Sequence, residues 1–161
     1  MTIQAGDALP NGTLTTMADG QIKPLGTDEL FGGKTVVLFA VPGAFTPTCS
    51  AQHLPGFIEH ADALRAKGVD TIACLSVNDV FVMDAWGRSQ DPDGKVTMLA
   101  DGNGDYAKAL GLELDATGFG MGLRAQRFAL VAKDGVVASL HVEAPGEFRV
   151  SSAESVLSAL D

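Results

Sequence analysis

Apolar residues in this chain form two kinds of pattern, short unbroken runs and longer runs with helical spacing. The first unbroken run, residues 35–41, is apolar and β-branched, which predicts a strand buried on both faces. Over residues 50–67 apolar side chains return every three or four positions, which predicts a helix ended by Gly68. Pro55 and Gly56 lie inside this helix, so we expect a kink or a break there.

The same two patterns continue along the chain. They predict strands over residues 69–77 and 96–100, and helices over residues 79–90, 105–110 and 151–160. Asn78 or Asp79 is the expected N-cap of its helix. Late in the chain, apolar runs over residues 127–133 and 136–143 flank an Asp-Gly pair, which is typical of a β-hairpin. This order predicts an α/β fold whose mixed, mostly parallel central sheet has helices on both faces.

Length and charge restrict the function. A chain of 161 residues can bury one substantial core, so we expect a single domain over residues 1–161. The formal net charge of −9 argues against binding to nucleic acid. The longest apolar run, residues 36–41, is too short to cross a bilayer, so we expect no membrane role.

The first residues of the sequence and the cysteine content predict the cellular location. The first ten residues, MTIQAGDALP, have neither the charged nor the apolar region of a signal peptide. Two cysteines are too few for the disulfide framework of a small secreted domain. We therefore expect a reducing, cytoplasmic setting.

Cys49 follows the first predicted strand by a short loop and lies near the start of a helix. Sites of α/β proteins gather at the carboxyl ends of strands, and a helix N-terminus offers N–H groups that favour a thiolate. Pro42 and Pro47 stiffen the loop, and the Thr46 hydroxyl is within reach of the sulfur or of its target. Position alone leaves open whether Cys49 is reactive or is an inert core thiol.

The segment VPGAFTPTCSAQHLPGF, residues 41–57, resembles the active-site segment of the type II peroxiredoxins, also called the peroxiredoxin V group. Pro42, Thr46 and Cys49 form the P-x-x-x-T-x-x-C signature of the superfamily. Segments 73–86, 94–101 and 127–137 also look like their counterparts there, so the resemblance covers nearly the whole chain. It implies a thioredoxin-like fold and a thiol-specific peroxidase that reduces hydrogen peroxide and organic hydroperoxides through a sulfenic acid on Cys49.

The resemblance also implies the roles of the site residues. Cys49 is the peroxidatic cysteine, and Pro42, Thr46 and Arg127 close its pocket, with neither metal nor organic cofactor. Arg127 favours the charged sulfur, and with Thr46 it can donate hydrogen bonds to the leaving oxygen. Pro42 shields the sulfenate from water. The residues alone do not distinguish Arg127 from the nearby Arg124.

The fate of the sulfenic acid is less constrained. Family members with an internal resolving cysteine carry it near the last helix, where this chain has Arg149-Val-Ser-Ser152. Cys74, in the middle of a predicted strand, reads as a core thiol. The resemblance therefore implies an external thiol, glutaredoxin with glutathione or else thioredoxin. Two alternatives remain open: a Cys49–Cys74 disulfide, and a redox sensor or interaction protein in which oxidation of Cys49 is a signal.

Further expectations concern the surroundings of Cys49. His53 lies one turn further on, so the pair could belong to a cysteine hydrolase, although a catalytic pair on one helix would be unusual; the resemblance gives His53 a supporting role. Two ligands do not make a zinc site. The resemblance also implies a homodimer that forms beside the active site through Ala44, Phe45, Phe81 and Phe119. We further expect the start of the Cys49 helix to unwind during catalysis.

Overall fold

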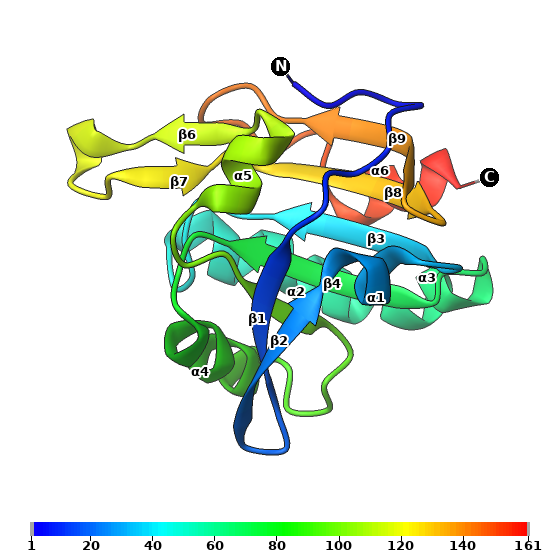
Figure 1. Ribbon diagram of the computed structural model, residues 1–161, viewed down its shortest axis with the longest axis horizontal. Coiled ribbons are helices and arrows are strands. Elements are labelled where there is room, and N and C mark those ends of the chain that lie inside the picture. The colour runs from blue at the N-terminus through cyan, green and yellow to red at the C-terminus, as the bar shows by residue number, and fades with distance from the viewer. Residues whose placement is uncertain (1, 161) are drawn as a thin grey trace.

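A seven-stranded sheet forms the centre of the protein, whose computed structural model describes residues 2–160 (Figure 1). In order across the sheet the strands are β2 (Gln21–Gly26), β1 (Thr13–Ala18), β5 (Thr97–Ala100), β4 (Thr71–Ser76), β3 (Thr35–Ala40), β8 (Phe128–Lys133) and β9 (Val136–Val142). The central strands β5, β4 and β3 are parallel, and the strands on both sides are antiparallel. Met1 and Asp161, the ends of the predicted domain, lie outside the described residues.

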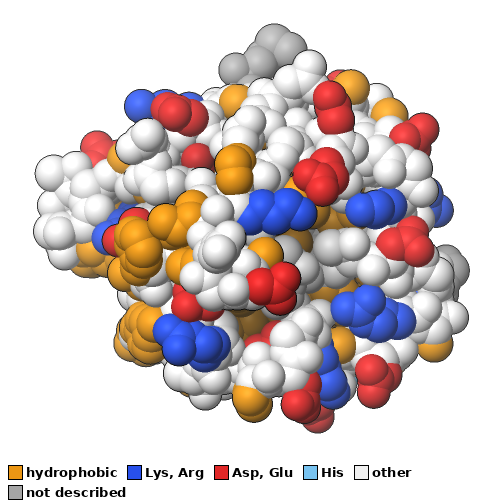
Figure 2. Space-filling view, turned by 60° about the horizontal axis from the view of Figure 1, so that its bottom comes forward, with side chains coloured by type: hydrophobic (Ala, Val, Ile, Leu, Met, Phe, Trp, Pro, Cys, Tyr) orange, Lys and Arg blue, Asp and Glu red, His pale blue; other side chains and the backbone are white. Residues whose placement is uncertain are grey.

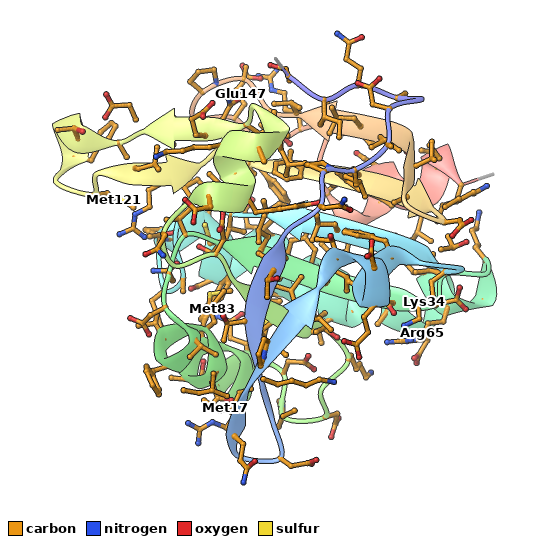
Figure 3. All side chains as sticks on the ribbon, viewed as in Figure 1. Met17, Lys34, Arg65, Met83, Met121 and Glu147 are labelled. Carbon is orange, nitrogen blue, oxygen red and sulfur yellow. The ribbon has the colours of Figure 1, made fainter. Side chains whose placement is uncertain are left out.

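Helices cover both faces of this sheet, as predicted. They are α1 (Thr27–Phe31), α2 (Leu54–Glu59), α3 (Ala61–Ala66), α4 (Val80–Gln90), α5 (Asp105–Leu110) and α6 (Ala153–Ala159). In Figure 1, α1 and α5 lie in front of the sheet, and α2, α3 and α6 lie behind it. Met83 projects from α4 into the same core as residues of α2, α3 and α6 (Figure 3). None of the helices within residues 2–160 is long and apolar enough to span a membrane.

Strand β3 shows why an unbroken apolar run is needed at the centre. Val36 and Leu38 pack into the core under α1 and α5, whereas Val37 and Phe39 pack into the core under α2, α3, α4 and α6. Successive side chains of a strand point to opposite faces, so both sets are buried. The predicted hairpin is also confirmed, because Asp134 and Gly135 turn between β8 and β9 with positive φ angles of 49° and 77°.

The predicted helix over residues 50–67 is divided differently from the prediction. A π-helical turn, η1 (Cys49–His53), leads into α2, and the chain breaks again at His60 before α3. The interruptions thus lie on either side of Pro55-Gly56 rather than at this pair. Pro55 occupies the first turn of α2, where a residue without an N–H is tolerated.

Two hairpins were not predicted. β1 and β2 form an N-terminal hairpin whose second strand is largely exposed and contains Pro24, so it lacks the apolar alternation of a half-buried strand. A second, small hairpin consists of β6 (Glu113–Asp115) and β7 (Leu123–Ala125). It extends beyond the sheet at the left of Figure 1. The N-cap of α4 was predicted correctly, since the Asp79 carboxylate accepts a hydrogen bond from the Val82 N–H.

Candidate active site

Cys49 lies just beyond the carboxyl end of β3. The chain leaves the sheet after Val41, whose N–H still bonds to the carbonyl of Leu75 in β4. It then forms a loop over residues 42–46 and becomes helical from Pro47. Cys49 opens η1, and its side chain is fully buried in the core under α2 and α4. π-helical turns are frequent at functional sites because they displace one residue from the regular helix.

Arg127 bridges Cys49 and His53. Its Nη2 donates a hydrogen bond to the Cys49 sulfur at 3.1 Å, and its Nη1 lies 2.9 Å from His53 Nδ1. The guanidinium also lies over the Phe148 ring, 5.8 Å from its centre. By contrast, Arg124 donates to the carbonyl oxygens of Met121 and Val77. The structure therefore separates the two arginines that the sequence left equivalent.

His53 accepts a hydrogen bond from Arg127 because its other nitrogen is a donor. Nε2 lies 2.9 Å from the Ser151 carbonyl oxygen, which can only accept, so Nδ1 is left to accept from Arg127. Burial, together with the charge of Arg127, lowers the pKa of His53 to about 3. His53 is thus neutral near pH 7 and holds the guanidinium without competing with it for the sulfur.

Glu143 orders the segment that carries the Ser151 carbonyl. Its buried carboxylate accepts hydrogen bonds from the N–H groups of Arg149, Val150 and Ser151 and from the Ser151 hydroxyl. Burial alone raises the pKa of Glu143, but these hydrogen bonds outweigh it and lower the pKa below its usual value. Cys49, Arg127, His53, Ser151 and Glu143 form one chain of hydrogen bonds, here called the arginine network.

Sequence reasoning missed the outer half of this network. Ser151 was considered as the start of the last helix and as the place of an absent cysteine. Glu143 was considered only as the end of a strand. The one available signal was Glu143 itself, an acidic residue at the end of an otherwise apolar run. Its role becomes evident only in the folded protein, where the N–H groups of residues 149–151 bond to it.

The loop over residues 42–46 places the remaining predicted residues. The Thr46 hydroxyl donates to the Gly43 carbonyl at 2.7 Å, so within the described residues its hydrogen bond goes to the loop and not to the sulfur. Pro42 is half-buried at the start of the loop. The Ala44 N–H donates to the Asn78 side chain, and Phe45 has a positive φ of 64°. A non-glycine residue in that conformation indicates backbone strain, which is common at functional sites.

Cys74 lies on β4 and faces the same core as Cys49. It pairs with Phe39 of β3 and is fully buried, and both cysteines are free. Burial raises the pKa of the Cys74 thiol well above its usual value, as does the nearby Cys49, with partial compensation by Arg127. Cys74 therefore stays a thiol at neutral pH.

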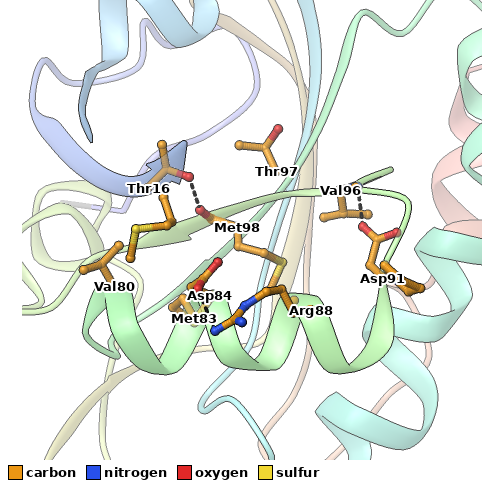
Figure 4. A pocket seen from close by; sticks show the side chains of 13 residues that line it. Thr16, Val80, Met83, Asp84, Arg88, Asp91, Val96, Thr97 and Met98 are labelled. Atoms are coloured by element: carbon orange, nitrogen blue, oxygen red, sulfur yellow. Dashed lines mark hydrogen bonds and ion pairs between the residues drawn. The ribbon is translucent and has the colours of Figure 1, made fainter. Parts of the chain in front are cut away.

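A cavity of about 320 Å³ lies between α4 and the strands β1 and β5 (Figure 4). Met17, Met83 and Met98 line it, together with an ion pair between Arg88 and Asp84. It is not the reaction site, because neither cysteine lines it. Among the described residues no group of three histidine, cysteine or acidic side chains is arranged to hold a metal ion.

Comparisons with known proteins agree with this geometry. The sequence matches the Redoxin family over residues 4–157. It is 54% identical to the protein named Peroxiredoxin-2E-2, chloroplastic, of Oryza sativa subsp. japonica, over 99% of this chain and 73% of that protein. It is 50% identical to Peroxiredoxin-2B of Arabidopsis thaliana, over 98% of each.

A solved structure shows the same fold. The crystal structure of reduced Prx3 from Vibrio vulnificus in complex with H₂O₂ superposes with a TM-score of 0.95 at 56% identity, covering 99% of this chain and 100% of that one. The predicted thioredoxin-like fold is thereby confirmed.

Proposed function

Because this chain belongs to the type II peroxiredoxins and is a thiol-dependent peroxidase, we propose that Cys49 is the sulfur that attacks the peroxide. The observation that carries this assignment is the hydrogen bond from Arg127 Nη2 to Cys49 Sγ at 3.1 Å. A fixed cation at this distance stabilises a thiolate, which is the nucleophilic form.

In the first step the Cys49 thiolate attacks one peroxide oxygen. An S–O bond forms, the O–O bond breaks, and the second oxygen takes a proton and leaves as water or an alcohol. Arg127 can donate to the leaving oxygen, and the Thr46 hydroxyl, which donates to Gly43, still offers lone pairs to a peroxide O–H. Pro42 shields the sulfenic acid from water. Hydrogen peroxide is the substrate we expect first, because the Vibrio vulnificus relative was solved with H₂O₂.

In the second step an external thiol resolves the sulfenic acid. Its sulfur bonds to Cys49, water leaves, and a second thiol then releases Cys49 as a thiol. Cys74 is a poor resolving group because it is fully buried and its raised pKa keeps it protonated. Ser151 and Ser152 carry no sulfur. Glutaredoxin with glutathione is the donor we favour, and thioredoxin is the second candidate.

One assay tests these assignments. Consumption of hydrogen peroxide with glutathione and glutaredoxin is compared for the wild type, Cys49→Ser and Cys74→Ser. We expect sustained turnover to disappear in Cys49→Ser alone. If folded Cys74→Ser also fails, an internal Cys49–Cys74 disulfide resolves the reaction. If the wild type turns over neither with glutathione and glutaredoxin nor with thioredoxin, the alternative in which oxidation of Cys49 is a signal is favoured.

The assembly that we propose is a homodimer. Phe45, Phe81 and Phe119 are 56%, 63% and 86% exposed, and they lie in the loop before Cys49, in α4 and between β6 and β7. Figure 2 shows hydrophobic side chains gathered on the left of the face in view, the side on which Figure 1 places α4 and the β6–β7 hairpin. Exposed apolar groups gathered in this way are typical of a protein interface.

Two broader assignments are also proposals. A single domain over residues 1–161 is supported by the sheet, whose strands run from residue 13 to residue 142. A cytoplasmic location is supported by the two cysteines, which are both free and buried, whereas two similar plant proteins are named as chloroplastic. Fluorescence of a tagged chain in cells would test the location.

A further inference from the structure

The π-helical turn that begins at Cys49 leaves one carbonyl oxygen without a helical partner. In η1 the Leu54 N–H bonds to the Cys49 carbonyl, five residues back. In the same register, the next donor would be residue 55 and the next acceptor the Ser50 carbonyl. Residue 55 is a proline and has no N–H. The turn that carries the reactive sulfur therefore lacks one of its own hydrogen bonds.

Helix α4 supplies the missing donor from outside. Gln90 Nε2 donates to the Ser50 carbonyl at 3.0 Å, and Trp86 Nε1 donates to the Ser50 hydroxyl at 3.0 Å. We call Ser50, Trp86 and Gln90 the Ser50 clasp. Among the described residues, the buried oxygen of the Gln90 amide has no hydrogen-bond partner. An unpaired buried oxygen is unfavourable, so the clasp holds the turn while leaving part of its own hydrogen bonding unsatisfied.

The burial of Cys49 gives this clasp a functional meaning. The Cys49 side chain is fully buried, so the sulfur of an external thiol cannot reach it while η1 is folded. A peroxide is much smaller, and its reaction needs the sulfur held at Arg127. The first step of the reaction therefore requires a closed turn, and the second step requires an open one.

We propose that Trp86 and Gln90 are positioning residues that hold η1 closed through Ser50 and thereby set how long the oxidised sulfur stays buried. This proposal rests on the external-thiol step proposed above. In the closed turn, sulfenic acid meets a second peroxide, an S–O bond forms as the O–O bond breaks, and sulfinic acid and water result. In the open turn, an external thiol forms an S–S bond with Cys49 as water leaves. A weaker clasp favours the thiol.

The test begins with Gln90→Met, which keeps the length of the side chain and removes the donor. Loss of one hydrogen bond to a carbonyl corresponds to about a threefold to tenfold rise in the open population. Hydrogen exchange of residues 50–54 in the reduced protein should accelerate by that factor. The number of turnovers completed before sulfinic acid inactivates the enzyme, followed by intact mass, should rise in parallel.

A rescue variant separates positioning from general damage. Pro55→Ala restores an N–H that can reach the Ser50 carbonyl, so Gln90→Met combined with Pro55→Ala should return both readouts toward wild type. Ser89→Ala is the matched control, since among the described residues its hydroxyl donates within α4, to the Trp86 carbonyl. It should leave both readouts unchanged.

Three results would overturn the proposal: unchanged exchange in Gln90→Met, no rescue by Pro55→Ala, or faster exchange without added resistance to inactivation. If Gln90→Met does not fold, Ser50→Ala removes the acceptor of Trp86 and is read in the same way. Exchange in the reduced protein needs no turnover. If the external-thiol step is wrong, the wild type fails to turn over with every thiol donor. The exchange result does not depend on that outcome, so the two failures are distinguishable.

Discussion

A single guanidinium connects the sulfur of this protein to the rest of its site. Arg127 uses one nitrogen for Cys49 and the other for His53, so its position is fixed at both ends. A lysine carries the same charge but not two donors in a fixed plane. The geometry of the donor, and not the charge alone, is therefore what we expect the peroxide step to depend on.

Arg127→Lys should slow the reaction of Cys49 with hydrogen peroxide by about tenfold to a hundredfold, the factor expected for loss of a well-placed hydrogen bond to a charged group. Stopped-flow measurement of the second-order rate constant tests this. Arg124→Lys is the control, because that guanidinium bonds to Met121 and Val77 and not to the sulfur. Equal losses in the two variants would contradict the assignment.

His53 should make the fold sensitive to acid. Its pKa is about 3 in the folded protein and 6.5 in the unfolded chain, so the unfolded chain gains a proton as pH falls below 6.5 while the folded one does not. Stability is unaffected above 6.5 and falls below it, by about 2 kcal/mol at pH 5. In His53→Gln, urea unfolding at pH 7 and pH 5 should lack this loss. An identical pH dependence in both proteins would refute the buried neutral histidine.

The sequence predicted the inner residues of the site better than the outer ones. Cys49 was found because its loop, helix start and motif all lie within a few residues of one another. Arg127 required the family resemblance, since only the folded chain brings it across 78 positions to the sulfur. Glu143 and Ser151 could not be found, because their role is to hold a third residue in place and local sequence does not show such a role.

At the scale of elements, the segment between β9 and α6 behaves as a support for the site. Glu143 gathers three consecutive N–H groups of residues 149–151 and so fixes the carbonyl that His53 uses. The support has no regular secondary structure of its own. One carboxylate therefore holds three consecutive N–H groups of this support.

Glu143→Gln should destabilise the protein by about 1–3 kcal/mol, because an amide oxygen replaces a charged acceptor and its NH₂ group faces N–H donors. Urea unfolding measures the loss, and hydrogen exchange of residues 149–151 should rise with it. Glu147, labelled in Figure 3, provides the control: it is half exposed and pairs with Arg149 at 3.7 Å, so Glu147→Gln should change stability little. Similar losses in both variants would show that Glu143 has no special role.

Elements with strong apolar patterns were predicted, and elements without them were missed. The strands β3 and β4 and the helix α4 bury enough side chains that their apolar pattern is visible in the sequence. The β1–β2 hairpin was missed because β2 is largely exposed. The helix after Cys49 was predicted as one element because apolar spacing is the same for α and π turns over such a short length, and only the backbone hydrogen bonds separate them.

At the scale of the whole molecule, the exposed phenylalanines are the feature that a monomer does not explain. Phe119→Asp should shift the protein toward monomers of 16.6 kDa in sedimentation velocity, because a charge cannot be buried in an apolar interface without a partner. Ile22→Asp is the control, since Ile22 is 52% exposed on β2, away from the site. A monomeric wild type, or equal effects of both changes, would contradict the dimer.

The strand order also has a consequence for synthesis. The β1–β2 hairpin leaves the ribosome before the other strands of the sheet, yet its neighbour there, β5, begins only at Thr97. We expect the nascent hairpin to stay undocked until β5 emerges, and its edge to be available to chaperones in that interval. Protease digestion of stalled chains whose emerged part ends before or after residue 100 would show protection of residues 13–26 only in the longer ones.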